Sequence, residues 1–335
     1  MEKLYRASGG LLAAALIAVF LVAEAGAQAP DLSAVLSELG FPADAEKKVL
    51  AGKFVTTDVK PTSERELAVG MAFFLKVPPV ELVSSLQEGL LMDVDPDAHA
   101  HGYIKGDGSL AEFESLDMSS QSGAYLKAKP GGDLNLSSAE IAAFKKLAGQ
   151  SASSTEVEKQ VHASLLARLR AYRKSGLDGI ASYARGGGEQ RSGAEDLRAA
   201  SAASVALKKH VPAFYGVLNG YPASRPPELE ERFLWVSYEA HGTPVVILTH
   251  AMSLATGDAY AVCQRQFYVS GGYNVEQAVA GFLPVTGGTL VVYLNRTSTD
   301  QITGFGGSSK RAIGRRVMAS QLKSVFEKLR AKVAK

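Results

Sequence analysis

Hydrophobic residues recur at every second position in a segment near the start of the chain: Leu67, Val69, Met71, Phe73, Leu75 and Val77. A period of two is the signature of a β-strand with one buried face. Two prolines at 78–79 end this strand, because proline cannot donate to a neighbouring strand and suits the first turn of a helix. Helical spacing follows, and Gly89 is a typical C-cap. We therefore predict a strand and then a helix over 64–89, with a partner strand at 50–60.

The middle of the chain, from about 137 to 220, has helical periodicity. It opens with a capping box made by Ser137 and Glu140. A long amphipathic helix follows, and its apolar stripe consists of Val157, Val161, Leu165, Leu169 and Tyr172. A further helix is predicted at about 194–210. The segment 219–230, "NGYPASRPPELE", contains N-G and P-P pairs and is predicted to be a connector.

Beyond this connector the pattern indicates strands rich in branched and aromatic residues. We predict four of them, at 232–240, 243–255, 259–269 and 287–297. A short helix, "YNVEQAVAGFLP", is expected between the third and the fourth, over 273–284. The last element is a helix of about 25 residues, with the apolar stripe Ile313, Val317, Leu322, Val325, Phe326, Leu329 and Val333.

These elements predict an α+β fold. A sheet with one apolar face must bury it, and a long amphipathic helix is a suitable cover. We expect an antiparallel sheet that grips the long C-terminal helix, with a helical insertion in the middle of the chain. A sheet that curves around this helix would leave a cavity between the two.

Two segments carry a resemblance to a known superfamily. "VPPVELVSSL" (77–86) and the strand "TLVVYLNRT" followed by a long helix resemble the opening and the close of START-like, or helix-grip, proteins. The resemblance covers 50–90 and 230–335, and it implies a single START-like domain from residue 28 to 335. It also implies an apolar ligand held between the sheet and the C-terminal helix. The helical block at 137–220 departs from the START-like pattern.

The chain also resembles a group of uncharacterised exported bacterial proteins. The shared stretches are "RQFY" and "LNRTSTDQITGFG". This second resemblance implies no activity.

The first residues predict export. Lys3 and Arg6 precede an apolar run at 10–23, and small residues at Ala25 and Ala27 complete the pattern of a secretory signal peptide. The run is short for a transmembrane helix, which needs about 20 residues. We therefore predict cleavage after Ala27 and a periplasmic or secreted protein; the alternative is an uncleaved N-terminal membrane anchor. With a single cysteine, Cys263, the chain forms no internal disulfide.

Charge is unevenly distributed although the whole chain carries only +2. From residue 308 to 335 there are nine Lys or Arg residues against Glu327 alone, a balance of +8. Such a basic helix is a candidate for an anionic membrane surface or for an envelope protein partner. The alternative is a solvated helix face paired with the acidic remainder of the chain. No nucleic-acid partner is expected.

The stretch "NRTSTDQITGFGGSSKRAIGRR" (295–316) joins the last strand to the last helix. It lacks the spacing of a phosphate-binding P-loop. Its glycines allow a turn that leads into a helix N-terminus, where free N–H groups and the helix dipole attract anions. The anion-binding candidates at this N-terminus are Ser308, Ser309, Lys310 and Arg311. The alternative is a simple corner in which Ser308 is the N-cap.

Polar residues on otherwise apolar strand faces are the candidate ligand-binding groups. His250, Arg265 and Arg296 each lie in register with hydrophobic residues of their own strand. Because arginine is a bidentate donor, these positions suit the carboxylate or phosphate of an amphipathic molecule. Trp235 and Phe267 complete the predicted site. The alternative is a structural network in which the charges pair with Glu239 or Asp300.

The sequence indications of a catalytic or a metal site are weaker than those of a ligand-binding site. "DVDPDAHAHG" (93–102) resembles a cation-binding loop, but it lacks the EF-hand glycine at position six. His99 and His101 are candidate zinc ligands, and the alternative is that both are solvated histidines of a polar loop. No nucleophile elbow or zinc-protease motif is present. We predict no catalytic constellation, no metal and no cofactor.

The function favoured by the sequence is a carrier for a lipid-like small molecule. Two alternatives remain: an envelope interaction module without a small ligand, and a cavity enzyme of the cyclase or hydrolase type that uses His250.

Overall fold

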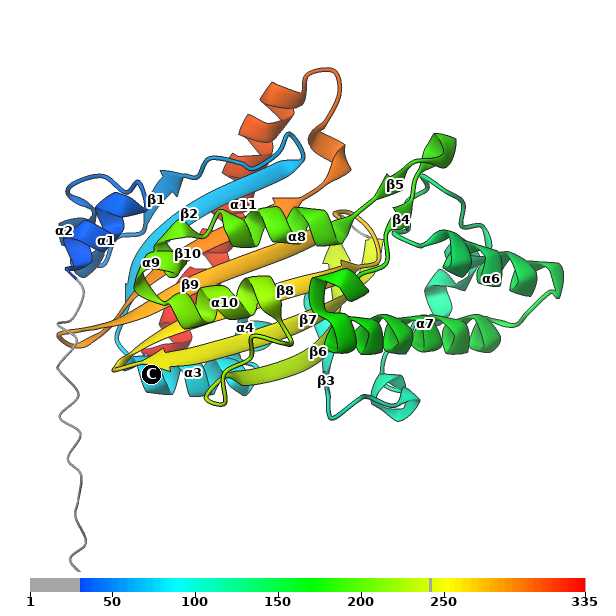
Figure 1. The fold of residues 1–335 in the computed structure, drawn as a ribbon, viewed down its shortest axis with the longest axis horizontal. Coiled ribbons are helices and arrows are strands. Elements are labelled where there is room, and N and C mark those ends of the chain that lie inside the picture. Colours follow the sequence, from blue (N-terminus) through cyan, green and yellow to red (C-terminus); the bar gives the residue numbers. More distant parts are fainter. Residues whose placement is uncertain (1–30, 241–242, 335) are drawn as a thin grey trace, which may run out of the picture. The chain divides into compact units, whose positions relative to one another are not determined.

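An eight-stranded antiparallel sheet is the centre of the fold in the computed structural model, which describes residues 31–240 and 243–334 (Figure 1). The strands lie in the order β1-β2-β10-β9-β8-β7-β6-β3. Their bounds are β1 (Val55–Asp58), β2 (Glu66–Leu75), β3 (Ala98–Ile104), β6 (Glu230–Ala240), β7 (Thr243–Thr256), β8 (Ala259–Val269), β9 (Val275–Val285) and β10 (Gly288–Ser298). A separate two-stranded sheet contains β4 (Tyr183–Ala184) and β5 (Gln190–Arg191).

Helices precede, interrupt and follow these strands. The α-helices are α1 (Leu32–Glu38), α2 (Ala45–Leu50), α3 (Pro79–Gln87), α4 (Leu90–Val94), α5 (Ser122–Leu126), α6 (Ser138–Gly149), α7 (Ser154–Ser175), α8 (Gly193–Ala202), α9 (Val205–His210), α10 (Pro212–Gly220) and α11 (Gly307–Val333). Short 3₁₀ turns are η1 (Leu110–Phe113), η2 (Ser119–Gln121), η3 (Gly176–Gly179), η4 (Gly186–Gly188) and η5 (Asp300–Ile302).

One face of the sheet is covered by α11, α3 and α4. Phe326 of α11 stacks on Phe73 of β2, with ring centroids 4.7 Å apart. Tyr293 of β10 meets Phe326 edge-on at 4.9 Å. Together with Leu329 these rings belong to one buried cluster with residues of β9 and α3. The predicted α+β class, with an antiparallel sheet and a long C-terminal helix, is confirmed.

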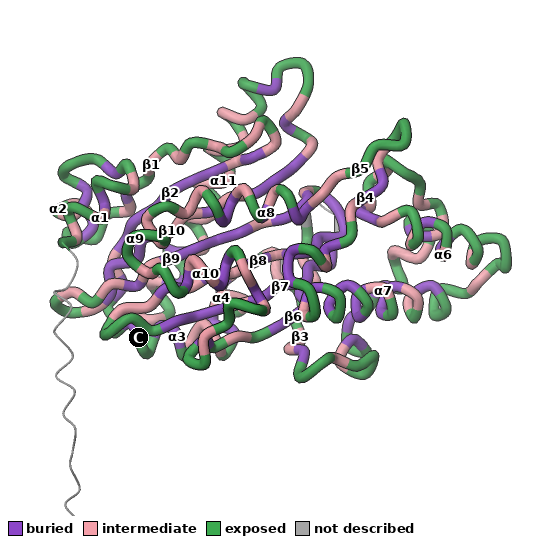
Figure 2. Tube along the Cα trace, in the orientation of Figure 1, coloured by how far each residue is buried: buried purple, intermediate pink, exposed green. Residues whose placement is uncertain are grey.

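The opposite face of the sheet is covered by the helical middle of the chain. α8 and α10 lie over the strands in Figure 1, and α7 adds its buried stripe at one end. Leu197 of α8, Phe214 of α10 and Leu169 of α7 are all fully buried with residues of β6, β7, β8 and β9. The sheet therefore has helices on both faces, and Figure 2 shows its central strands as largely buried.

β2 illustrates what this double cover does to a strand. Its odd-numbered residues face α11, as the period of two predicts. Ala72 of its other face is also fully buried, because it packs against Leu36 of α1 and Val49 of α2. β2 therefore has two buried faces where the sequence pattern indicates one.

The segment 273–284, expected to be a short helix, is instead strand β9. It lies between β8 and β10 and is buried on both sides. Val275 and Val279 face the helical middle, whereas Ala280 and Phe282 face α11. A strand of this kind shows no polar alternation, and its Glu, Gln and Ala residues favour a helix locally. Pairing with both neighbours overrides that preference.

Three further expectations need correction. The polar loop predicted around His99 and His101 contains edge strand β3, which pairs with β6. The single helix predicted at 194–210 is two helices, α8 and α9. α10 precedes and partly overlaps the predicted connector, and no helix was predicted there.

The predicted signal peptide, residues 1–27, lies outside the described residues. The residues from Asp31 onward form one compact unit. Within the described residues, none of the helices is long and apolar enough to span a bilayer.

Candidate functional site

His250 and Arg265 lie directly opposite each other on β7 and β8. Opposed residues of antiparallel strands project from the same face, and here that face is the one under α7 and α10. Both side chains are completely buried. The sequence pattern placed each residue on a face of its own strand. That the two are neighbours follows from the register of β7 against β8.

The Arg265 guanidinium is held by several elements at once. It donates to the Gln277 side chain of β9 at 2.9 and 2.8 Å, to the Tyr172 hydroxyl at 3.2 Å and to the Ser201 hydroxyl at 3.2 Å. It also donates to the backbone carbonyl of Leu218 at 2.7 Å. Each of these four acceptor groups is a neutral oxygen. Arg265 therefore ties β8 and β9 to α7, α8 and α10.

His250 continues this network toward the surface. Its Nδ1 lies 3.0 Å from the Tyr172 hydroxyl and its Nε2 lies 2.9 Å from Oε2 of Glu231 on β6. Its ring stacks on Phe233 with centroids 4.2 Å apart. Burial lowers the pKa of His250 to about 4, against the effect of Glu231, which raises it. His250 is therefore a neutral hydrogen-bonding group at neutral pH.

Glu231 is the outer end of this chain of hydrogen bonds. Burial raises the pKa of Glu231, but hydrogen bonds from His250 and Tyr221 and the charge of Arg225 lower it by more, so the carboxylate is ionised. Arg225 lies 3.1 Å away and is half-exposed. A chain of contacts thus joins the surface ion pair of Arg225 and Glu231 to the buried cation Arg265. His250 and Tyr172 are the two residues between them.

Such a network is suited to fixing the sheet against its helices. A Glu–His–Tyr chain also resembles a proton relay, yet both His250 and Tyr172 are fully covered by protein, and a general base must reach its substrate. Cys263 is on the same face, and burial raises the pKa of its thiol to about 12. It therefore stays protonated and is a poor nucleophile.

Phe267 and Trp235 lie on the same face as His250 and Arg265. Phe267 stacks on Tyr172, with centroids 4.2 Å apart and the planes nearly parallel. Trp235 is fully buried and its Nε1 donates to the Glu112 carbonyl at 2.7 Å. The structure brings all five predicted ligand-binding residues to one face of the sheet, and this is the face opposite α11.

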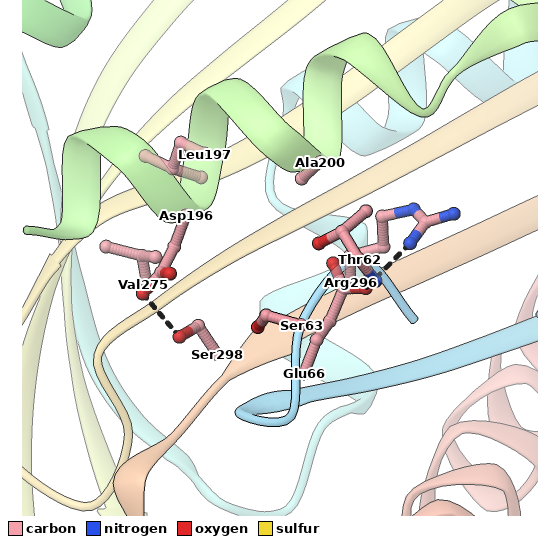
Figure 3. A pocket seen from close by; sticks show the side chains of 9 residues that line it. All are labelled: Thr62, Ser63, Glu66, Asp196, Leu197, Ala200, Val275, Arg296 and Ser298. Carbon is pink, nitrogen blue, oxygen red and sulfur yellow. Dashed lines mark hydrogen bonds and ion pairs between the residues drawn. The ribbon is translucent and has the colours of Figure 1, made fainter. Parts of the chain in front are cut away.

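Arg296, the fifth, lies on that face too but under α8. Its Nη1 lies 2.8 Å from Oε2 of buried Glu66. The two line a small polar recess of about 10 Å³, room for about one water molecule, with Asp196 and Ser298 opposite (Figure 3). The Ser298 hydroxyl donates to Asp196 at 2.5 Å.

The acidic partners proposed from the sequence are engaged elsewhere. Asp300 binds Arg185 at 3.0 Å and Arg191 at 2.8 Å. Glu239 lies 3.4 Å from His99 on the edge of the sheet. Buried pairing of the strand arginines is thus present, but its partners are Glu66 and neutral oxygens.

The glycine-rich stretch before α11 forms a corner. Gly306, with φ of 74°, is the N-cap residue of α11, so Ser308 lies inside the first turn and is not the N-cap. Ser308, Ser309 and Lys310 are exposed. The Arg311 guanidinium donates to the Glu64 carbonyl at 3.2 Å.

An apolar hollow of about 60 Å³ lies on the α11 side of the sheet, between α3–α4 and strands β6, β7 and β8. Its apolar lining consists of Val83, Leu86, Leu91, Met92, Leu234, Ala251, Met252 and Val262. Within the described residues its lining comes from α3, α4, the turn between them and strands β3 and β6–β8, next to the cluster that holds α11.

Polar groups stand around this hollow. The Arg232 guanidinium donates to the Gln87 carbonyl at 2.9 Å and lies 5.7 Å from the Tyr103 ring centroid. Gln87 in turn contacts Glu230 and the Ser253 hydroxyl. Sequence reasoning missed these groups, because they come from four separate elements. The one available signal was a charged residue, Arg232, at the start of a predicted strand.

Metal-binding geometry is not found in the described part of the chain, where no three His, Cys, Asp or Glu side chains gather. His99 pairs with Glu239, and His101 packs edge-on against Tyr103.

Neither family models, nor curated proteins, nor solved structures give a match to this chain.

Proposed function

We propose that this protein binds a small amphipathic molecule, one with an apolar chain and an anionic group, and acts as its carrier in the periplasm or outside the cell. The ligand is held on the α11 side of the sheet, in the hollow under α3 and α4. The observation that carries the proposal is an apolar lining with an arginine, Arg232, at its rim. Small-molecule sites are typically concave and apolar, with a few polar groups that fix orientation.

The size of the hollow sets a condition on this function. At about 60 Å³ it is well below the roughly 300 Å³ at which drug-sized ligand sites begin. It accepts one end of a ligand as it stands, and a whole ligand requires α3 and α4 to move outward. Gly89 joins these two helices with φ of 102°, a conformation that glycine adopts without strain. It is the natural pivot for such a movement.

The buried network around His250 and Arg265 has a different role in this proposal. It anchors the sheet to the helical middle, so that the sheet stays fixed while α3 and α4 open on its other face. Arg265 has its donors engaged by the protein and is fully covered. A ligand carboxylate would have to displace these partners, whereas Arg232 is exposed and needs to release one backbone carbonyl.

The test is displacement of a fluorescent fatty acid, dansyl-undecanoic acid, from purified protein. Leu86→Trp fills the mouth of the hollow and Arg232→Gln removes the cation. Each is expected to weaken binding at least about tenfold, or about 1.4 kcal/mol. Leu110→Trp is the matched control for added bulk, since Leu110 is an exposed leucine outside this site. Arg170→Gln is the matched control for charge, since Arg170 is also an exposed arginine that donates to backbone carbonyls.

The outcomes separate the candidate functions. Native mass spectrometry followed by lipid extraction should identify a bound amphipathic molecule in the wild-type protein. If the wild type binds no fatty acid and carries no extractable ligand, the carrier function is wrong. Recovery with one envelope complex would then favour an interaction module. If Leu110→Trp and Arg170→Gln weaken binding as much as Leu86→Trp and Arg232→Gln do, the probe does not bind specifically in the hollow.

A further inference from the structure

Three large hydrophobic side chains are exposed in the loop that leads into α11 and in the first turns of that helix. Phe305 is fully exposed, while Ile313 and Val317 are 62% and 47% exposed. Figure 2 shows the loop before α11 and its first turns as mostly exposed. Exposed apolar residues that occur singly need no explanation, but a group of them marks an interaction surface.

The helical periodicity places Ile313 and Val317 on one side of α11, four residues apart. The other side of the same turns faces the protein. Gly314 lies against the Leu67 side chain, where a Cβ would come within 3.1 Å of it. Arg311 donates to the Glu64 carbonyl. The apolar pair therefore points away from the sheet, in contrast to Phe326 and Leu329 further along the helix.

Positive charge surrounds this apolar pair. Lys310 and Arg316 are exposed and lie three residues before and after Ile313, on the same side of the helix. From residue 301 to 326 the chain contains no acidic residue, and it contains five basic ones: Lys310, Arg311, Arg315, Arg316 and Lys323. Arg315 is 3.7 Å from Asp58, an exposed carboxylate. The surface is thus both apolar and cationic.

We propose that the segment 305–317 binds the surface of an anionic lipid bilayer. Its apolar side chains enter the boundary between headgroups and acyl chains, and Lys310 and Arg316 contact lipid phosphates. A helix with an apolar stripe flanked by basic residues suits the plane of this interface. Exposed apolar side chains flanked by cations match the surface of an anionic bilayer, which adapts to the shape of what binds it. The inference is independent of the ligand proposed for the hollow.

The experiment is sedimentation of the full chain with vesicles of phosphatidylglycerol and phosphatidylethanolamine, against vesicles of phosphatidylcholine alone. The wild type should bind the anionic vesicles, and binding should weaken as salt is added, because screening reduces attraction to exposed charges. Replacing Lys310 and Arg316 by Gln should lower the partition coefficient about fivefold for each charge. Phe305→Ser, Ile313→Ser and Val317→Ser combined should abolish binding.

Matched controls exist for both sets of variants. Val80, Leu110 and Val205 are 57%, 51% and 62% exposed, and their combined replacement by Ser should leave vesicle binding unchanged. Lys145→Gln with Lys146→Gln makes the same change in net charge on α6. Every variant retains residues 1–27, so any contribution of that segment to sedimentation is common to all of them.

The proposal is overturned if the wild type does not sediment with anionic vesicles. It is equally overturned if it sediments as well with phosphatidylcholine, or if the 305–317 variants behave as the controls do. Melting curves for each variant separate lost binding from lost folding, and we expect them to coincide, since every changed side chain is exposed.

Discussion

We expect His250 to make the stability of the protein depend on pH. In the unfolded chain it takes up a proton near its ordinary pKa of 6.5, whereas burial lowers its pKa in the fold to about 4. Between these values the unfolded state binds more protons. The free energy of unfolding therefore falls as pH falls from 6.5 toward 4, and this contribution is fully restored above 6.5. The loss attributable to His250 is about 3 kcal/mol.

We predict that His250→Gln removes this part of the pH dependence. Glutamine can still bond to Tyr172 and Glu231 but does not titrate. Urea denaturation at a series of pH values from 7 to 4 measures the effect, and the wild type should lose more stability than the variant across this range. Parallel curves for the two proteins would mean that His250 titrates normally and is not buried as described.

Arg265 and Arg296 should respond to substitution through stability. Arg265→Met leaves buried acceptors such as the Leu218 carbonyl without a donor, at a cost of about 1–3 kcal/mol for each acceptor. Arg296→Met leaves Glu66 without its ion pair, and we expect a loss of similar size. Thermal melting with and without dansyl-undecanoic acid is the measurement. A variant that melts as the wild type does, yet fails to bind the probe, would identify that arginine as a ligand-binding residue.

The residues of the candidate site could be predicted only in part. His250 and Arg265 were recognisable because each is polar on an apolar strand face. Their partners were not, since Tyr172 is in the apolar stripe of α7 and Ser201 and Gln277 carry no pattern of their own. Arg232 gains meaning only from its position beside Gln87 and Tyr103, which the chain brings together from distant segments.

At the scale of elements, α11 should depend on Phe326 more than on its neighbours. Phe326 is buried between Phe73 and Tyr293, so Phe326→Asp places a charge in the core and should cost more than about 4 kcal/mol. Val325→Asp should cost less, because Val325 is half-buried. Ser324→Asp, on the exposed side of the same turn, is the control. Chemical denaturation ranks the three, and equal values for Phe326→Asp and Ser324→Asp would exclude the described packing of α11.

Element types followed the hydrophobic period wherever one face of an element meets solvent. α7 was predicted for this reason, and its stripe is buried as expected. Where both faces are covered, the period can still be present, as in β2, or absent, as in β9. The hydrophobic period also says little about edge strands such as β3, because consecutive residues of β3, which lie on opposite faces, are both exposed.

At the scale of the whole molecule, the helical middle is one of the two layers that bury the sheet. Its contacts form the largest buried apolar cluster in the described residues. We predict that replacing 137–220 by a Gly-Ser linker abolishes cooperative folding, because the faces of β6–β9 that carry Trp235 and Phe267 would be exposed. Circular dichroism melting is the measurement. A shortened chain with a sharp melting transition would show that the sheet and α11 suffice.

The strand order also governs when the sheet can be completed. Leu75 at the end of β2 pairs with Thr289 at the start of β10, so the two strands are separated by most of the chain. During synthesis from the N-terminus, β2 has only the short strand β1 as a neighbour until β10 emerges. Contacts this distant in sequence slow folding, and an open strand edge can template pairing between chains. The interval between the appearance of β2 and of β10 is therefore when the chain is most exposed to aggregation, and when a holding chaperone has the most to protect.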